Sequence, residues 1–183
     1  ERAEAAAEQA MAQFDVYKAC FEEHHARGLN AKLGLRESRP EDTALAGRLL
    51  EQMAAERRDY TNTWRLLAGF DSTPGAANAR LRDHFIDRDA FAAWAADYAA
   101  RLRAEHSDDA QRRAAMNRVN PKYVLRNYLA QTAIEQARDR RDYSEVERLL
   151  RVLQSPYDEH PKDADLAEPP PDWGRRIAVS CSS

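Results

Sequence analysis

Apolar residues recur at three- and four-residue steps over most of this chain, which is the spacing of one face of an α-helix. The first run predicts a helix from about Glu4 to Gly28, because glycine commonly ends a helix. Its apolar face consists of Met11, Phe14, Tyr17 and Phe21. A loop through Lys32 and Gly34 is expected to follow.

Start signals separate the next helices. Pro40 fits the first turn of a second helix, where its missing N–H costs nothing. That helix continues, or restarts, towards Gly69, and its apolar stripe is Leu45, Leu49, Leu50, Met53, Trp64 and Leu67. A loop at 71–75 and a short helix around Leu81 and Phe85 come next.

Two aspartates are candidate N-caps in the middle of the chain. Asp87 precedes a helix whose inward face is Phe91, Trp94, Ala95, Tyr98 and Leu102. We interpret these aromatic residues as core rather than as a cofactor site. Asp108, or Ser107, precedes a helix that ends near Val119.

An Asn-Pro pair and a capping box predict the last two helices. Asn120 as N-cap and Pro121 in the first turn would open one of them. Its inward face would be Leu125, Tyr128, Leu129 and Thr132. Ser144-x-x-Glu147 would open the other, which Ser155-Pro156 ends. Its stripe would be Val146, Leu149, Leu150 and Leu153.

Prolines change the character of the chain after residue 155. Pro156, Pro161 and the prolines at 169–171 disfavour helix, and 176–180 is the one strand candidate. The tail also holds Tyr157, Trp173, Ile177 and Val179, so we expect it to pack on something. The sequence therefore predicts an all-α region over 1–155 and an extended, Pro-rich tail over 156–183.

Composition and charge narrow the class of partners. The net charge of −3 and the pI of about 6.0 give no basic surface for nucleic acid or an anionic membrane. No apolar run is long enough to span a bilayer, and no secretion signal is apparent. Two cysteines are too few for a secreted disulfide framework. We expect a cytoplasmic, bacterial protein, and the missing initiator Met suggests a piece of a longer one.

Motifs for nucleotide and metal binding are missing. The six glycines never cluster, so no phosphate-binding loop can be built, and kinase-type His-Arg-Asp and Asp-Phe-Gly strings do not occur. Cys20 and His24 have the spacing of helical metal ligands, but a tetrahedral site needs more donors. We therefore expect no catalytic, cofactor or metal residue in this chain.

Charged clusters are interpreted mainly as solvated surface. A basic run at the Asn120-Pro121 junction could meet a phosphate, but acidic neighbours favour a solvated face. The run is Arg112, Arg113, Arg118, Lys122 and Arg126. The acidic residues of the tail are expected to be solvated as well. These are Asp158, Glu159, Asp163, Asp165 and Glu168.

Cys181 lies three positions from the end of the chain, where a thiol is accessible. The residues alone favour an idle surface thiol over a redox thiol. A bond to Cys20 would require the two Cα atoms to lie within about 7 Å.

Several long strings resemble the SelO (selenoprotein O) family. They are 120–131 (NPKYVLRNYLAQ), 142–150 (DYSEVERLL), 156–159 (PYDE), 170–174 (PPDWG) and 180–183 (SCSS), with weaker segments at 32–35 and 59–61. Within them, the family signature comprises Asn120, Pro121, Lys122, Tyr123, Arg126, Asn127 and Trp173.

The resemblance implies a fold and an activity for a larger parent protein. SelO proteins have a protein-kinase-like fold and act as protein adenylyltransferases, which move AMP from Mg-ATP to Ser, Thr or Tyr hydroxyls of proteins. Their nucleotide and metal residues lie upstream of the matched strings. Members carry a terminal cysteine or selenocysteine where Cys181 stands, implicated in redox control, and this makes Cys181 a candidate redox residue.

The leading hypothesis is therefore the multi-helix C-terminal part of a kinase-like adenylyltransferase, inactive by itself. Its partners would be the N-terminal catalytic region of the same protein, which binds ATP and Mg²⁺, and the parent's protein substrates. The alternative is a stand-alone helical protein-interaction module without enzymatic activity. A gene that begins at or just before Glu1 would favour this alternative.

Overall fold

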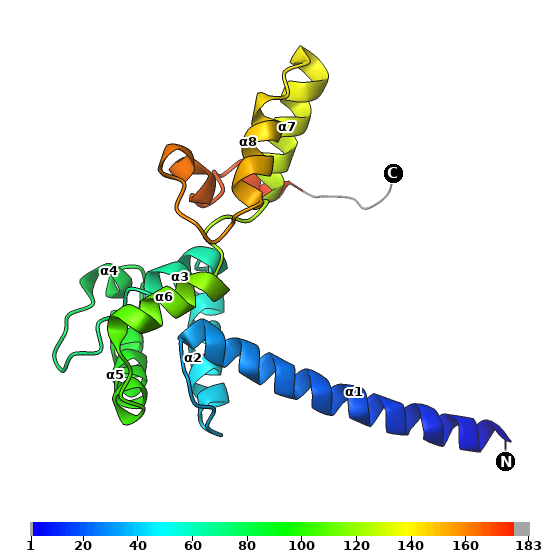
Figure 1. Ribbon diagram of the computed structural model, residues 1–183, viewed down its shortest axis with the longest axis vertical. Helices are drawn as coiled ribbons and strands as arrows, with labels where there is room; N and C mark the ends of the chain where they lie inside the picture. The colour runs from blue at the N-terminus through cyan, green and yellow to red at the C-terminus, as the bar shows by residue number, and fades with distance from the viewer. Residues whose placement is uncertain (1, 178–183) are drawn as a thin grey trace.

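The computed structural model is all-helical over the residues that it describes, namely the backbone of residues 2–177 and the side chains of residues 11–177 (Figure 1). The all-α prediction is confirmed, and the kinase-like architecture stays a prediction. The elements are α1 (Arg2–Leu33), α2 (Asp42–Ala55), α3 (Tyr60–Leu67), α4 (Ala79–Arg82), α5 (Arg88–Ala104), α6 (Asp109–Val119), α7 (Asn127–Arg140), α8 (Ser144–Leu153) and the 3₁₀-helices η1 (Pro161–Ala167) and η2 (Gly174–Arg176).

A first hydrophobic core lies among α1 to α6. It includes Leu33, Leu49, Trp64, Tyr98, Leu102 and Met116, all buried. The indole N–H of Trp94 donates a hydrogen bond to the Leu45 carbonyl at 2.9 Å, which fixes α5 against α2. Trp94 and Tyr98 are thus core residues, as the sequence predicted.

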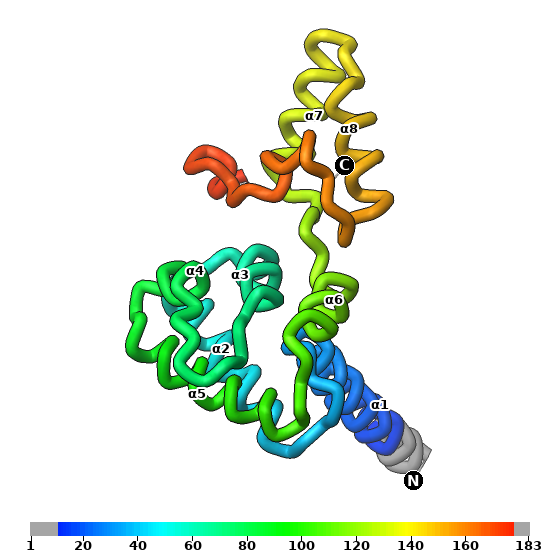
Figure 2. The backbone as a smooth tube through the Cα atoms, turned by 60° about the vertical axis from the view of Figure 1, so that its left-hand side comes forward, coloured from blue at the N-terminus to red at the C-terminus, as the bar shows by residue number. Residues whose placement is uncertain are grey.

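A second, smaller core is built by α7, α8 and the tail, and Figures 1 and 2 show α7 and α8 side by side. Its buried members are Tyr123, Ala133, Leu149, Val152, Leu166 and Ala167. Leu166 and Ala167 belong to η1, so the tail does pack on the helices. Residues 120–126 form the connecting segment between the end of α6 and α7, and Figure 2 shows it passing from one helical group to the other.

Helix α1 is longer than predicted. It passes through Gly28 and ends at Gly34, whose φ of +71° suits a glycine after a helix. Gly34 N–H donates to the Ala31 carbonyl at 3.1 Å, and Leu35 N–H donates to the Asn30 carbonyl at 2.9 Å, the pattern of a Schellman motif. Gly28 lies inside the helix, where a glycine is only mildly unfavourable.

Side-chain caps fix several helix starts. Asp87 and Asp108 accept hydrogen bonds from Ala90 N–H and Gln111 N–H, which confirms both predicted N-caps. Asp59, which the sequence did not single out as a cap, accepts from Asn62 N–H and restarts the chain as α3. Pro40 lies two positions before α2 instead of in its first turn.

The predicted start of α7 is wrong. Asn120 is not an N-cap, because its side chain is buried and bonded to α1, and the helix begins seven residues later at Asn127. The inward face differs accordingly. Leu125 and Thr132 are exposed, and Tyr123 and Ala133 are buried instead.

The capping box before α8 does not form, although the helix does begin at Ser144. The Ser144 hydroxyl accepts a hydrogen bond from the Gln136 side chain of α7 at 3.2 Å, and Asp142 accepts from Ser144 N–H. Within the predicted stripe, Leu149 is buried, but Val146 and Leu150 are exposed and Val152 takes their place. The packing partner α7 thus decides which face of α8 turns inward.

The tail is not purely extended, because it contains η1 and η2. Pro161 occupies the first turn of η1, where its missing N–H is tolerated. Four of the five acidic residues predicted to be solvated are exposed, and Asp163 is the exception. Asp163 is buried and accepts hydrogen bonds from Arg148 at 2.7 Å and Arg151 at 3.1 Å. The strand candidate at 176–180 falls mostly outside the described residues.

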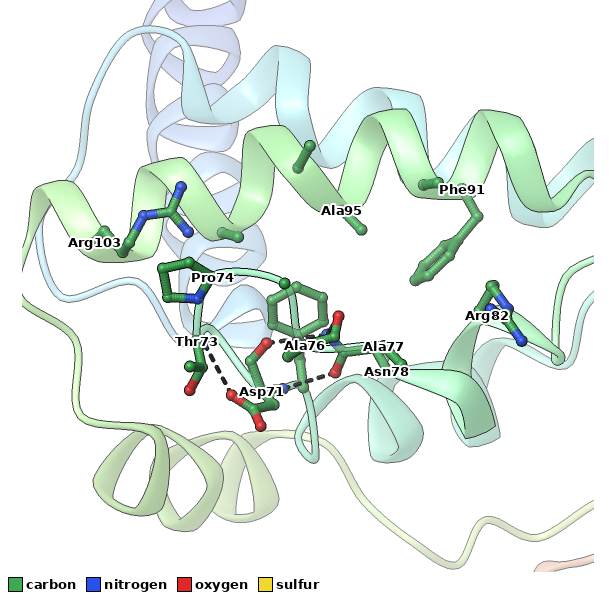
Figure 3. A pocket seen from close by; sticks show the side chains of 15 residues that line it. Asp71, Thr73, Pro74, Ala76, Ala77, Asn78, Arg82, Phe91, Ala95 and Arg103 are labelled. Carbon is green, nitrogen blue, oxygen red and sulfur yellow. Dashed lines mark hydrogen bonds between the residues drawn. The ribbon is translucent and has the colours of Figure 1, made fainter.

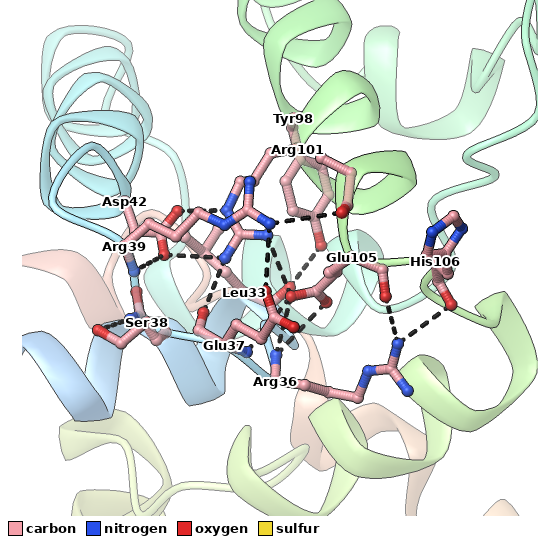
Figure 4. Close-up of polar contacts among 12 residues, drawn as sticks. Leu33, Arg36, Glu37, Ser38, Arg39, Asp42, Tyr98, Arg101, Glu105 and His106 are labelled. Atoms are coloured by element: carbon pink, nitrogen blue, oxygen red, sulfur yellow. Dashed lines mark hydrogen bonds and ion pairs between the residues drawn. The ribbon is translucent and has the colours of Figure 1, made fainter.

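A buried ion cluster holds the α1–α2 loop on α5 (Figure 4). The Arg101 guanidinium donates to the Asp42 carboxylate at 2.7 Å and to the Glu105 carboxylate at 3.1 Å, and all three side chains are almost completely buried. The Glu105 carboxylate also accepts from Arg36 N–H at 3.2 Å. Loss of Arg101 would leave two buried carboxylates without their shared cation.

Candidate functional site

The connecting segment carries most of the family signature and is the candidate functional region. Lys122 N–H and Tyr123 N–H both donate to the Pro156 carbonyl, at 2.8 and 3.1 Å. The segment is thereby tied to the residue where α8 gives way to the tail. Pro121 is half-buried, and Asn127 is exposed at the start of α7.

Asn120 fastens this segment to α1. Its amide N–H donates to the Lys32 carbonyl at 3.1 Å, and its side-chain oxygen accepts from the Lys32 ammonium at 3.1 Å. The ammonium also lies 5.4 Å from the centre of the Tyr60 ring and 5.7 Å from that of Trp64. Burial lowers the pKa of Lys32. The Lys32 ammonium thus connects the end of α1 both to the aromatic rings of α3 and to Asn120.

Arg65 of α3 joins the same segment from the other side. Its guanidinium donates to the carbonyls of Asn117 and Asn120, each at 3.2 Å, and to the Glu159 carboxylate at 2.8 Å. Lys122 also binds Glu159, and this hydrogen bond, with the nearby charges, lowers the pKa of the Glu159 carboxyl. Glu159 is therefore held by two cations rather than free in solvent.

Arg126 and Asp59 form a third link. The two side chains make paired hydrogen bonds at 2.6 and 3.1 Å, a forked geometry that arginine and carboxylate favour. Burial alone would raise the pKa of Asp59, but the Arg126 hydrogen bond and the Asn62 N–H outweigh it, and the pKa lies below its usual value. Asp59 therefore caps α3 and binds the start of α7 at the same time.

Trp173, the last residue of the signature, contacts α7 but remains 56% exposed. Trp173 lies edge-to-face on Tyr128 with ring centres 6.0 Å apart. A Cβ atom on Gly174 would come within 2.7 Å of the Tyr128 Cβ, so only glycine allows this approach. Tyr123 is buried against His160, whose carbonyl accepts its hydroxyl hydrogen bond at 3.2 Å.

A groove of about 1120 Å³ runs between α3, α4, α6 and the tail. Arg65 and Lys122 line it and both pair with Glu159, which lines it as well. Asp59 also lines it and pairs with Arg126, while Arg80 and Arg113 are exposed along its wall. His84 also lines it, and burial together with the charge of Arg58 lowers the pKa of His84. The ion pairs along this groove connect the two helical groups, and its polar walls could form hydrogen bonds with a bound peptide.

The predicted basic face does not exist as one surface. Arg112 is buried and donates to the Phe70 carbonyl and to Asp109 at 2.5 Å. Lys122 and Arg126 are committed to carboxylates, as described above, and only Arg113 and Arg118 are exposed. The interpretation as a solvated face is therefore wrong for Arg112, Lys122 and Arg126, because each of them binds a carboxylate.

A smaller cavity of about 380 Å³ lies between α5 and the loop at 71–78 (Figure 3). Four alanines of α5 and the rings of Phe70 and Phe91 give it apolar walls. The loop is held by Asn78, whose side chain accepts from Asp71 N–H at 2.8 Å, and by Ser72, whose hydroxyl donates to Asp109 at 2.6 Å. This cavity could not be predicted from the sequence, because its walls meet only in the folded chain.

Cys20 joins no site among the described residues. Cys20 is exposed on α1, as is His24, whose Nδ1 lies 2.7 Å from the Arg27 guanidinium. Cys181 lies outside the described residues, so its redox role and its distance from Cys20 stay predictions.

The donor set of the groove does not fit a magnesium–nucleotide site. Magnesium prefers carboxylate oxygens, and Asp59 and Glu159 already accept hydrogen bonds from arginine or lysine. Among residues 11–177, no three His, Cys, Asp or Glu side chains gather where they could hold a metal ion. Within the described part of the chain, no helix combines the length and hydropathy needed to span a bilayer.

Comparison with known proteins identifies the family of this chain. Residues 3–154 match the family model described as protein adenylyltransferase SelO. Proteins named protein nucleotidyltransferase YdiU from Burkholderia multivorans, Burkholderia lata and Burkholderia pseudomallei are 51%, 50% and 52% identical over 182 residues. Each comparison covers 100% of this chain and 35% of the relative, so the chain spans about a third of the length of these relatives. The chain therefore belongs to the protein adenylyltransferase SelO family.

Proposed function

We propose that this chain is the helical C-terminal portion of a protein adenylyltransferase, and that it supports catalysis without performing it. The observation that carries the proposal is the identity of 50–52%, over the whole of this chain, with proteins named protein nucleotidyltransferases. Because the chain spans 35% of those relatives, most of each relative lies outside the matched region. The catalytic machinery is assigned to that remaining part.

In the parent protein, a Ser, Thr or Tyr hydroxyl of a protein substrate attacks the α-phosphorus of ATP, and pyrophosphate leaves. The residues that would hold magnesium are assigned to the remaining part, and the ion would there compensate the charge of the phosphates. Catalysis of this kind depends on positioning and on compensation of phosphate charge. In the groove, Asp59 pairs with Arg126, and Glu159 pairs with Lys122 and Arg65. These pairs join distant parts of the chain, which supports a scaffold role.

The scaffold role is localised in the connecting segment. Asn120 binds α1, Arg126 binds the start of α3, and Lys122 and Tyr123 bind the end of α8. Four signature residues thus fix the two helical groups to one another. In the parent, a rigid pair of groups would give the catalytic region a fixed surface on which to pack, and would fix where the tail with Cys181 departs.

The test uses the full-length protein and this chain, each incubated with a mixture of protein substrates. Label carried on the α-phosphate of ATP should appear on protein with the full-length enzyme, and label on the γ-phosphate should not, because AMP and not phosphate is transferred. This chain alone should transfer neither. Transfer of α-label by this chain alone would contradict the scaffold role, and no transfer by the full-length protein would contradict the activity.

Redox control through Cys181 is a separate part of the proposal. Mass spectrometry of the full-length protein with and without reductant should detect a Cys181 disulfide that reductant removes. A free Cys181 thiol in protein prepared under oxidising conditions would contradict redox control.

A stand-alone interaction module is the second candidate. It is favoured by the exposed aromatic face of α1, which a separate partner protein could also cover. A gene whose reading frame begins at or just before Glu1 would favour the module, and a frame that continues far upstream would favour the adenylyltransferase.

A further inference from the structure

The outer part of α1 exposes a ladder of large apolar side chains. The exposed fractions are 61% for Met11, 60% for Phe14, 64% for Tyr17 and 55% for Phe21. Successive ring centres are 6.4 Å apart for Phe14 and Tyr17, and 6.2 Å apart for Tyr17 and Phe21. This face, defined by these four residues, is called the α1 aromatic face. The sequence predicted it as the apolar face of its helix, and in the structure it covers no core.

The same part of α1 has no packing partner among the described residues. Figure 1 shows it projecting away from the other helices, and among residues 11–33 the buried side chains are Leu29, Asn30 and Leu33, all at the C-terminal end of α1. A projecting helix gains little stability from its backbone hydrogen bonds alone, because most helical stability in proteins comes from packing an apolar face. The α1 aromatic face is therefore expected to pack against a further surface that is not part of the described residues.

Two ion pairs form within this part of α1, and Asp15 is exposed and belongs to neither of them. Lys18 pairs with Glu22 at 3.9 Å, and Arg27 pairs with Glu23 at 3.6 Å, each four positions apart. The helix thus carries two internal ion pairs and a row of unpartnered rings. Its cover is accordingly expected to be apolar rather than charged.

We infer that the α1 aromatic face packs, in the full-length protein, against an apolar surface of the same polypeptide that lies outside this chain. The inference rests on the proposed function, in which this chain is a portion of a longer enzyme. About two thirds of each curated relative lies outside the region matched by this chain, so ample polypeptide is available.

Effective concentration favours the same polypeptide over a second copy of this chain. Four side chains of this exposure offer on the order of 500 Å² per helix, given the roughly 150–250 Å² that a large aromatic residue can bury. Two copies joined face to face would bury about 1,000 Å², below the roughly 1,200 Å² at which stable complexes begin. A covalently attached surface needs no such area, because tethering raises its effective concentration to about millimolar.

The direct test places a photoreactive amino acid at position 17 of the full-length protein. The matched control carries it at position 19, where Ala19 is also exposed but lies on the opposite side of the same helix. After illumination, mass spectrometry should identify cross-links from position 17 to peptides outside residues 1–183 of the same molecule. Position 19 should give at least tenfold fewer of these.

Mixing light and heavy isotope-labelled protein separates the alternatives. Cross-links between the α1 aromatic faces of a light and a heavy molecule, or equal yields at positions 17 and 19, would overturn the inference. An AMP-transfer assay on the unmodified full-length protein distinguishes this failure from failure of the proposed function. AMP transfer without the predicted cross-link would refute only the proposed packing of the α1 aromatic face. The cross-link without AMP transfer would refute only the proposed activity.

Paired substitutions provide a second readout. In full-length protein, Phe14→Asp with Tyr17→Asp should make α1 at least tenfold more sensitive to limited proteolysis. Ala12→Asp with Ala19→Asp, two exposed positions on the opposite side, should change the cleavage rate less than twofold. Equal cleavage rates in the two double variants would overturn the inference.

Discussion

Asn120 and Lys32 exchange two hydrogen bonds across 88 positions of sequence, one between the Asn120 amide and the Lys32 carbonyl and one between the Lys32 ammonium and the Asn120 oxygen. The asparagine is buried, and the ammonium is half-buried over two aromatic rings. This reciprocal pair fixes the end of α1 to the segment that leads into the second core. Asn120, the first residue of the family signature, thus has a structural role in this chain.

Asn120→Ala should destabilise the chain by about 1–3 kcal/mol, because it leaves the Lys32 carbonyl and ammonium without a buried partner. Urea unfolding followed by circular dichroism measures this free energy. Asn127→Ala, at an exposed signature position, should stay within about 0.5 kcal/mol of wild type. Equal effects of the two substitutions would contradict the assigned role of Asn120.

Arg101→Met should cost about 3–5 kcal/mol, because it leaves the Asp42 and Glu105 carboxylates buried without a shared cation. Arg103→Met removes an exposed arginine of the same helix and should change the free energy of unfolding by less than about 0.5 kcal/mol. The same urea titration measures both variants. A loss below 1 kcal/mol for Arg101→Met would mean that the cluster is not a net stabilising feature.

Substitution by alanine should have opposite effects on stability at Gly28, within α1, and at Gly34, directly after it. Gly28→Ala should stabilise the chain by about 0.5–1 kcal/mol, since Gly28 lies within the helix and nothing approaches its Cβ position within 4 Å. Gly34→Ala should destabilise it by more than about 1 kcal/mol, because of the positive φ and because the new Cβ would lie 2.5 Å from the Arg112 side chain. Thermal unfolding of both variants tests the pair. Stabilisation by both would show that α1 does not end at Gly34.

Glu56 should contribute stability that acid removes. Burial opposes its ionisation, but hydrogen bonds from Ile86 N–H, Gln52, Asp87 N–H and Arg58 lower its pKa to about 2, against 4.5 for an ordinary glutamate. A carboxyl whose pKa is lower in the folded state than in the unfolded state stabilises the fold. This stabilisation is complete at pH values above the unfolded-state pKa, and it is lost as the pH falls through the folded-state pKa.

Glu56→Gln should therefore be less stable than wild type above pH 5, and the difference should shrink between pH 4.5 and about 2. Urea midpoints measured across this pH range test the prediction. The control is Glu51→Gln, at an exposed position of α2, which should follow the wild-type curve. A Glu56→Gln difference that stays constant with pH would contradict the prediction.

Local signals predicted many helix starts, because an N-cap depends on residues three positions apart. Asp87 and Asp108 act as the sequence indicated. Gly28 and Gly34 could not be ranked, because the choice depends on the packing of α1 against Arg112 and Met116 of α6. Ser144 likewise lost its capping role to Gln136 of the neighbouring helix.

For the candidate site, the sequence predicted the signature residues but not the residues that they bind. The family strings singled out Asn120, Lys122 and Arg126, but their partners come from distant parts of the chain. Arg126 pairs with Asp59, 67 positions away, and Arg65 reaches Glu159 across 94 positions. Charge pairing over such separations leaves no periodicity in the sequence, which is why the basic run and the acidic tail were interpreted as solvated surface.

The central claim is that nucleotide chemistry lies outside this chain. Isothermal titration calorimetry of this chain with Mg-ATP tests it most directly, with the full-length protein as the matched sample. We expect no measurable heat of binding for this chain at millimolar nucleotide, and saturable binding for the full-length protein. Saturable binding of Mg-ATP by this chain alone would show that it contains a nucleotide site.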